Sequence, residues 1–288
     1  MRSTSQLPAA ALLPHMAGQP GPRIGRGSLV VGDPATDPAR GMRRLPGARV
    51  EAITVARVLG TTPLLEADAD EVAVLAGLPT AGGLLHLATH GLLDDEAPDL
   101  SALALAGRDE LTVDELLGVG LDTDLAVLSA CDSGRGDITA TGDVVGLARG
   151  LLAAGVRHVV VSLWPVDDRV GCLTMAAMAQ RLAAGEPVAS ALAAAQRAVL
   201  ATAAATRDAD YAALAAAADT PAVASGGRVR DARPKAVFSD RPPTIRPGHL
   251  SCTSGCAPGL CLSGNRPLRP ESAISDAARW GEIAIGVL

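Results

Sequence analysis

The chain of 288 residues is long enough for one large domain or two small ones, and its hydrophobic fraction of 48% can build a substantial apolar core. Aromatic residues make up only 1% and the formal net charge is −6, so the chain lacks the stacking surfaces and clustered positive charge of nucleic-acid binders. We therefore expect a protein that acts on small molecules or other proteins and has no nucleic-acid partner.

The cysteine content and the N-terminus bear on the compartment. The five cysteines are an odd number, and Cys131 and Cys172 have no partner nearby in sequence, which argues against a secreted disulfide framework. Residues 1–27 are rich in Pro, Gly and Arg and form a loose leader that is too weakly apolar for a signal peptide. No uninterrupted apolar run reaches the ~18 residues of a membrane span. We expect a cytoplasmic protein without membrane contact.

From residue 28 onward, short apolar runs alternate with segments of helical periodicity. The predicted strands lie within 28–34, 61–67, 82–91, 101–107, 123–130 and 156–163. The predicted helices lie within 45–60, 68–78, 111–120, 141–155, 169–185 and 187–205. Strands that are apolar on both faces and alternate with helices indicate a mostly parallel sheet covered on both sides. The sequence therefore predicts an α/β fold.

Beyond residue 221 this pattern stops. Residues 222–288 are dense in Gly, Pro, Ser and Arg and show neither the strand period nor the helix period over a useful length. We expect most of this tail to be disordered or weakly held. The predicted organisation is a leader over 1–27, a folded domain over 28–221 and a tail over 222–288.

Two of the predicted strands end in side chains that can react. One ends at His90, and another is followed directly by Cys131. The carboxyl ends of neighbouring parallel strands lie at the same edge of a sheet, where a thiol and an imidazole can act as nucleophile and general base. The N–H groups of Gly91 and Cys131 can stabilise an oxyanion. From spacing alone, an inert core thiol remains the commoner interpretation.

Four motifs in the chain resemble the CHAT domain, a caspase-like cysteine peptidase domain related to separase. They are HLATHGLLDDEAPDLSALALAG, LTVDELLGVGLDTDLAVLSACDSGRG, GDVVGLARGLLAAGVRHVVVSLWPVDD and AAMAQRLAAGEPVASALAAAQRAVL, and the resemblance extends over residues 28–200. It implies a caspase-like three-layer sandwich, a mostly parallel sheet with helices on both faces. It also implies that His90 of the T-H-G turn and Cys131 of the S-A-C turn form the catalytic dyad, without a metal or another cofactor.

The resemblance also places part of the substrate pocket in the loop that follows the strand at 156–163. Trp164, Asp167 and Asp168 lie there, and the two acids indicate a preference for Arg or Lys before the scissile bond, as in separase. Two alternatives remain open. The acids can instead cap the following helix, and Trp164 can be a core residue.

The predicted function is that of a cysteine endopeptidase acting on a protein or peptide. One alternative is a catalytically inactive scaffold that binds partner proteins, and another is a thiol enzyme acting on a non-peptide ester or amide. The scaffold alternative rests on the expected loss of the family's closing strand, which should lie near 222–240, where only Lys235–Phe238 could pair. Family members commonly follow helical repeats, so we expect that any regulatory repeat protein acts in trans.

Two further groups of residues have the composition of metal ligands. His86 lies four residues before His90, but the segment is a predicted strand, so His86 is expected to be a core histidine. His249, Cys252, Cys256 and Cys261 are close in sequence but lack paired C-x-x-C spacing. The sequence therefore predicts no metal site.

Overall fold

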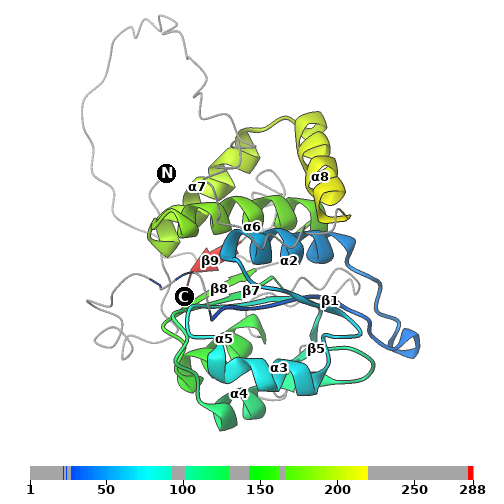
Figure 1. Cartoon of the computed structure of the whole chain (residues 1–288), viewed down its shortest axis with the longest axis vertical. Helices are drawn as coiled ribbons and strands as arrows, with labels where there is room; N and C mark the ends of the chain where they lie inside the picture. Colours follow the sequence, from blue (N-terminus) through cyan, green and yellow to red (C-terminus); the bar gives the residue numbers. More distant parts are fainter. Residues whose placement is uncertain are drawn as a thin grey trace, which may run out of the picture. The chain divides into compact units, whose positions relative to one another are not determined.

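The computed structural model describes residues 22, 24, 27–92, 101–129, 143–162, 166–219 and 285–287 (Figure 1). All of them belong to one compact unit formed by residues 1–223 and 282–288. Most of the predicted leader and nearly all of the predicted tail lie outside the described residues, and so does Cys131.

The main sheet within the described residues has six strands in the order β2-β1-β3-β7-β8-β9. The strands are β1 (Leu29–Pro34), β2 (Leu64–Glu66), β3 (Leu84–Ala88), β7 (Leu125–Leu128), β8 (His158–Ser162) and β9 (Ile285–Val287). The strands from β2 to β8 pair in parallel, and β9 pairs antiparallel with β8. The predicted mostly parallel sheet is thus confirmed.

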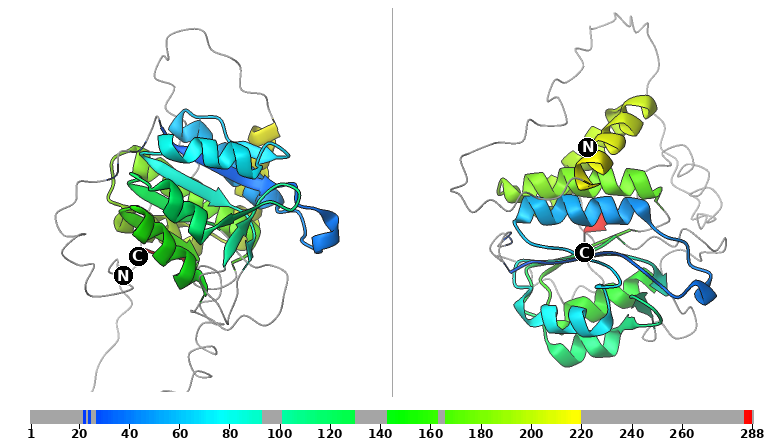
Figure 2. Two further views of the ribbon diagram at one scale, coloured as in Figure 1. Left: turned by 90° about the horizontal axis from the view of Figure 1, so that it is seen from below. Right: turned by 45° about the vertical axis from the view of Figure 1, so that its right-hand side comes forward.

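Helices cover both faces of this sheet (Figures 1 and 2). One face carries α2 (Pro46–Leu59) and α6 (Asp168–Ala183), which lie side by side. The other face carries α3 (Glu71–Gly77), α4 (Val113–Val119) and α5 (Asp143–Ala154), and short 3-10 turns occur at Pro38–Arg40 and Leu78–Thr80. The predicted three-layer α/β sandwich is therefore confirmed.

Two Ala-rich helices, α7 (Val188–Ala201) and α8 (Ala204–Asp219), pack against α6. The α8 helix was not predicted, and its Tyr211 and Leu214 pack against a cluster that includes Val50 and Cys172. No single helix in the described ranges is long and apolar enough to cross a membrane, whereas α7 and α8 together reach that length and hydropathy but meet at a bend of 119°.

A smaller antiparallel sheet lies beside the end of β3. It contains β4 (Gly91–Leu92), β5 (Ala102–Ala104) and β6 (Glu110–Thr112) in that order. Of these, only β5 was predicted, because it lies within a continuous apolar run, whereas β4 and β6 are short and lack such a run. Since β4 begins one residue after His90, this sheet fixes the backbone that leaves the candidate catalytic histidine.

The side chains of the main sheet alternate between two different environments. On the side of α3, α4 and α5, Leu85, Leu87 and Leu128 belong to a large cluster of buried aliphatic residues. On the side of α2, Gly32 and the polar His86 alternate with these residues, together with buried aliphatic residues such as Val30 and Val127. At Gly32 an added Cβ would lie 2.3 Å from the Cβ of Ala52, so α2 approaches β1 very closely.

The edge of the sheet beside β8 is occupied, contrary to the expectation that the closing strand is lost. Ile285–Val287 pairs there with Val160–Ser162. Lys235–Phe238, the segment considered for this position, lies outside the described residues. The expectation was wrong because the strand that pairs here comes from residues 285–287, far from residues 222–240, where the resemblance to the family placed it.

Candidate active site

The site lies where β3 and β7 end at the same edge of the sheet. The two strands are parallel neighbours with Leu87 opposite Leu128, and the N–H of Ser129 donates to the carbonyl of Leu87 at 2.9 Å. His90 follows β3 by two residues, and Ser129 is two residues before Cys131. The predicted convergence of the two strand ends is confirmed, while Cys131 itself lies outside the described residues.

His90 is held in one orientation by its backbone and by its ring. Its side chain is buried, and its Nε2 lies 2.7 Å from the carbonyl oxygen of Arg43. A carbonyl oxygen only accepts, so Nε2 carries the proton, and Nδ1 is the basic nitrogen of the neutral ring. The turn is fixed because the Thr89 hydroxyl donates to the Ala104 carbonyl at 2.6 Å and the Ala104 N–H donates to the His90 carbonyl at 2.9 Å.

The two predicted oxyanion donors are placed differently. Gly91 begins β4 directly after His90 and pairs with Leu103 of β5. The N–H of Cys131 lies outside the described residues. An oxyanion site made by these two groups therefore stays a prediction.

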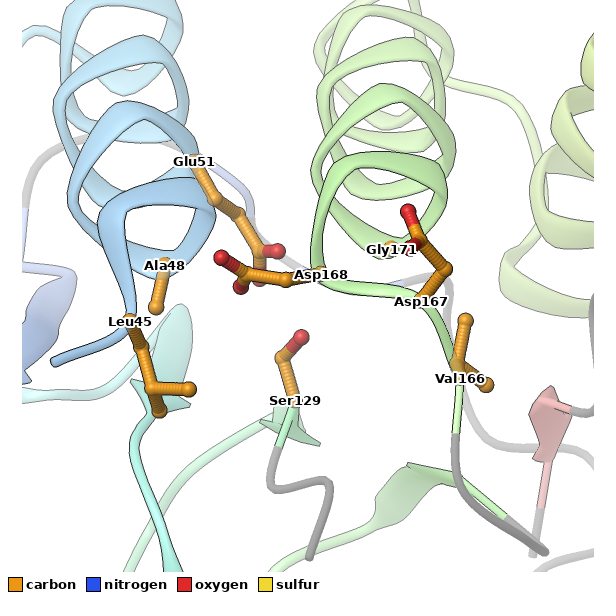
Figure 3. A pocket seen from close by; sticks show the side chains of 8 residues that line it. All are labelled: Leu45, Ala48, Glu51, Ser129, Val166, Asp167, Asp168 and Gly171. Atoms are coloured by element: carbon orange, nitrogen blue, oxygen red, sulfur yellow. The ribbon is translucent and has the colours of Figure 1, made fainter. Parts of the chain in front are cut away.

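A pocket opens beside this edge, between the first turns of α2 and α6 (Figure 3). Its lining includes Leu45, Ser129 and Val166, together with the carboxyl groups of Glu51, Asp167 and Asp168. The side chains of Glu51 and Asp168 extend toward one another, and the Ser129 hydroxyl points toward them. The remaining lining residues are Ala48 and Gly171, and Trp164 lies outside the described residues.

Asp167 caps the helix that follows it. Its carboxylate accepts the N–H groups of Arg169 and Val170 at 3.0 and 3.2 Å, as an N-cap acid does. The capping interpretation of this residue is thus confirmed, although Asp167 also lines the pocket.

Asp168 caps a different helix from its own. It accepts the N–H of Gly47, in the first turn of α2, at 2.6 Å. A Cβ at Gly47 would lie 2.5 Å from the Asp168 carboxyl carbon, so glycine is required for this contact. Burial raises the pKa of Asp168. The hydrogen bond from Gly47 lowers this pKa and the nearby charge of Glu51 raises it, and the net shift is upward. The pocket therefore contains a poorly solvated carboxyl group.

Glu51, which was not predicted as a site residue, accepts a hydrogen bond from the buried His86. The His86 Nε2 donates to the Glu51 Oε1 at 2.8 Å, and both side chains are at least 98% buried, with exposures of 1% and 2%. His86 is thus a core histidine, as predicted. A charged residue on the buried face of α2, among Ala48, Ala52 and Val55, was the signal that could have revealed this pair.

Cys172 provides a contrast to the candidate nucleophile. It is fully buried in α6, and desolvation raises its pKa far above the ordinary thiol value, with the charges of Glu51 and Asp168 adding to this effect. A thiol in this environment remains protonated and unreactive.

Metal ligation finds no support in the described ranges. No three His, Cys, Asp or Glu side chains among those residues are grouped so that they could hold an ion. His249, Cys252, Cys256 and Cys261 lie outside the described residues.

Comparisons with known proteins give three similarities. A family model described as "CHAT domain" matches residues 1–234. Tetratricopeptide repeat protein 28 of Mus musculus is 29% identical over 42% of this chain, which spans only 6% of that protein's length. The crystal structure of the "Arg specific cysteine proteinase gingipain R (RGPB)" is similar with a TM-score of 0.41 and 11% identity, over 62% of this chain and 44% of that one.

Proposed function

Because the chain belongs to the CHAT domain family, we propose that it is a cysteine endopeptidase with Cys131 as nucleophile and His90 as general base. The observation that carries the proposal is the common edge at which β3 and β7 end, with the His90 ring already oriented there. A strand end delivers the segment containing the thiol, and the neighbouring strand end delivers the imidazole.

The hydrogen bond to Arg43 supports a different role for each ring nitrogen of His90. Nε2–H is held by the Arg43 carbonyl, so Nδ1 is the nitrogen that takes the proton of Cys131. The imidazolium that forms keeps its Nε2–H bonded to that carbonyl, a charge-assisted contact that stabilises it. The same Nδ1–H then protonates the leaving amine.

The proposed chemistry is acyl transfer in two steps. The Cys131 thiolate attacks the peptide carbonyl, and the N–H groups of Gly91 and Cys131 stabilise the oxyanion. The C–N bond breaks as His90 donates its proton to the nitrogen, which leaves a thioester. Water activated by His90 then hydrolyses the thioester and regenerates the thiol.

We also propose that the pocket favours a basic residue before the cut bond. The carboxyl groups of Glu51 and Asp168 support this, because they lie in a poorly solvated space that a cationic side chain would neutralise. Both Asp167 and Asp168 also cap helices, so their presence has a structural explanation that the experiment must separate from specificity.

The scaffold alternative was favoured by the expected loss of the closing strand. Because β9 pairs with β8 at that edge, this reason for preferring a scaffold no longer applies. The non-peptide hydrolase or transferase alternative uses the same thiol and imidazole. We retain as proposals a cytoplasmic location and regulation by a repeat protein supplied in trans.

Labelling with a peptidyl acyloxymethyl ketone that carries Arg next to the reactive group tests the proposal. We expect labelling of Cys131 alone, and its loss in Cys131→Ala and His90→Ala. Matched probes that carry Leu or Glu in place of Arg measure the specificity of the pocket. In Asp168→Asn, the ratio of the labelling rate with the Arg probe to the rate with the Leu probe should decrease. Absence of any Cys131 labelling in folded protein would leave the scaffold as the better interpretation.

A further inference from the structure

Asp33 stands out at the end of β1 because of its backbone. It has a φ of 44°, a left-handed conformation that few residues other than glycine adopt, and Asp is among those that tolerate it. The β1–β2 register also shifts between Gly32 and Pro34, which places Asp33 at an irregularity in the strand. Such irregularities often redirect a side chain next to an active site.

The redirected carboxylate is buried and has several donors. It is 3% exposed. Arg44 donates from Nε at 3.0 and 3.1 Å and from NH2 at 2.6 Å, which makes a bidentate contact, and the N–H of Leu45 donates at 2.9 Å. One carboxylate therefore holds two consecutive residues, Arg44 by its side chain and Leu45 by its backbone.

These two residues directly follow the one whose carbonyl holds His90. Arg43 accepts the Nε2–H of His90 at 2.7 Å. On the other side, Leu45 packs with Ala48 against Ala88, the last residue of β3. The segment 43–45 is thus anchored at Asp33 and against β3, and the His90 ring is bonded to its first residue.

We infer that Asp33 is a positioning residue, which clamps Arg44 and Leu45 so that the Arg43 carbonyl stays against His90 and selects the Nε2–H tautomer. The inference rests on the proposed function of His90 as general base. A base of the opposite tautomer would present a protonated Nδ1 to the thiol and could not accept its proton. Asp33 acts only through this segment and does not contact substrate.

A merely structural role for Asp33 predicts something different. If the clamp only stabilises the loop, its loss lowers the unfolding temperature without changing the ring of His90 in the molecules that remain folded. The tautomer of His90 is therefore the readout that separates the two roles. It is visible in the ¹⁵N chemical shifts of the imidazole nitrogens, whether or not Cys131 is reactive.

Three variants of the full chain make the test. Asp33→Asn keeps an oxygen acceptor for Leu45 and loses the ion pair. Arg44→Lys loses the bidentate contact but keeps a positive charge beside Asp33. It therefore provides the test if Asp33→Asn does not fold. Glu66→Gln is the control. Glu66 also accepts a hydrogen bond from Arg44, at 3.1 Å, but this bond involves neither Asp33 nor Leu45.

We expect ¹⁵N-histidine spectra, assigned with His90→Gln, to show the Nε2–H tautomer in the wild type and in Glu66→Gln. Asp33→Asn should show a mixture of tautomers and a roughly tenfold slower alkylation of Cys131, with Arg44→Lys between the two. An unchanged tautomer in folded Asp33→Asn or Arg44→Lys would overturn the inference. A shifted tautomer with an unreactive wild-type Cys131 would uphold it and reject the peptidase proposal instead.

Discussion

The two faces of the main sheet differ in the buried polar groups that they carry. The face under α3, α4 and α5 is filled by buried aliphatic side chains such as Leu85 and Leu151. The face under α2 and α6 carries the buried His86–Glu51 hydrogen bond and, at its edge, the Asp33–Arg44 ion pair and the pocket. Both faces bury aliphatic side chains, Val30 and Val127 among them on the second, so the two faces differ in the buried polar pairs, which cost stability and place polar groups at the site.

Removing the acceptor of the buried His86 should have the greatest effect on stability. Glu51→Leu leaves His86 buried without its acceptor, and we expect a loss of about 3–5 kcal/mol in the free energy of unfolding. The double variant Glu51→Leu/His86→Leu should be more stable than the single variant, since buried pairs are often replaceable by apolar residues. Urea denaturation measures both, and a double variant no better than the single one would contradict the interpretation.

Truncating a side chain on the face under α3, α4 and α5 should lower stability without changing the reactivity of Cys131. Leu85→Ala removes a fully buried side chain, and we expect a loss of about 2–5 kcal/mol. Leu117→Ala, at a residue with 45% exposure, is the matched control and should change little. In the protein that remains folded, the rate of Cys131 labelling should be unchanged by Leu85→Ala. A slowed rate would show that the two faces are not separate in function.

The close approach of α2 to β1 predicts smaller effects of opposite sign for two Gly→Ala substitutions. Gly32→Ala places a methyl group against Ala52 and the Ala48 carbonyl, and the overpacking should cost about 1–3 kcal/mol. Gly118→Ala adds a methyl group on α4 where nothing lies within 4 Å, and it should stabilise the protein by about 0.5–1 kcal/mol. Thermal unfolding of both variants checks the signs, and equal signs would contradict the proposed packing.

The smallest expected effect is the pH dependence of Asp168. Its folded-state pKa lies above the ordinary value of 3.8, chiefly through burial, so the unfolded chain loses this proton first as the pH rises. Stability from this group is therefore present in acid and is lost as the pH rises through the folded pKa. Asp168→Asn should gain stability relative to the wild type as the pH rises from about 4 through the folded pKa. Denaturation curves that differ by the same amount at every pH would contradict this.

Local sequence patterns predicted most of the sheet, because strands such as Leu84–Ala88 are continuous apolar runs and helices such as Pro46–Leu59 end at a glycine, Gly60. They also placed His90 and the segment leading to Cys131 at one edge. They missed β9, whose pairing with β8 is a long-range contact that no local period encodes. They also missed the Arg43 carbonyl, because every residue has a carbonyl and only the fold selects this one.

Asp33 was visible in the sequence only as the middle of a Gly-Asp-Pro turn. Its burial depends on Arg44, eleven residues later, folding back over the end of β1. Glu51 was likewise hidden, since the partner that justifies its burial is His86 on another element. Polar pairs of this kind become evident only when the helix and the sheet are brought together.

The most direct test of the central claim compares Cys131 with Cys172 in the same molecule. Alkylation by iodoacetamide at neutral pH, followed by peptide mass spectrometry, gives a rate for each thiol in wild type and in His90→Ala. We predict that Cys131 reacts far faster than the buried Cys172 and loses this advantage in His90→Ala. Equal rates in the wild type, or a Cys131 rate that does not depend on His90, would contradict the account.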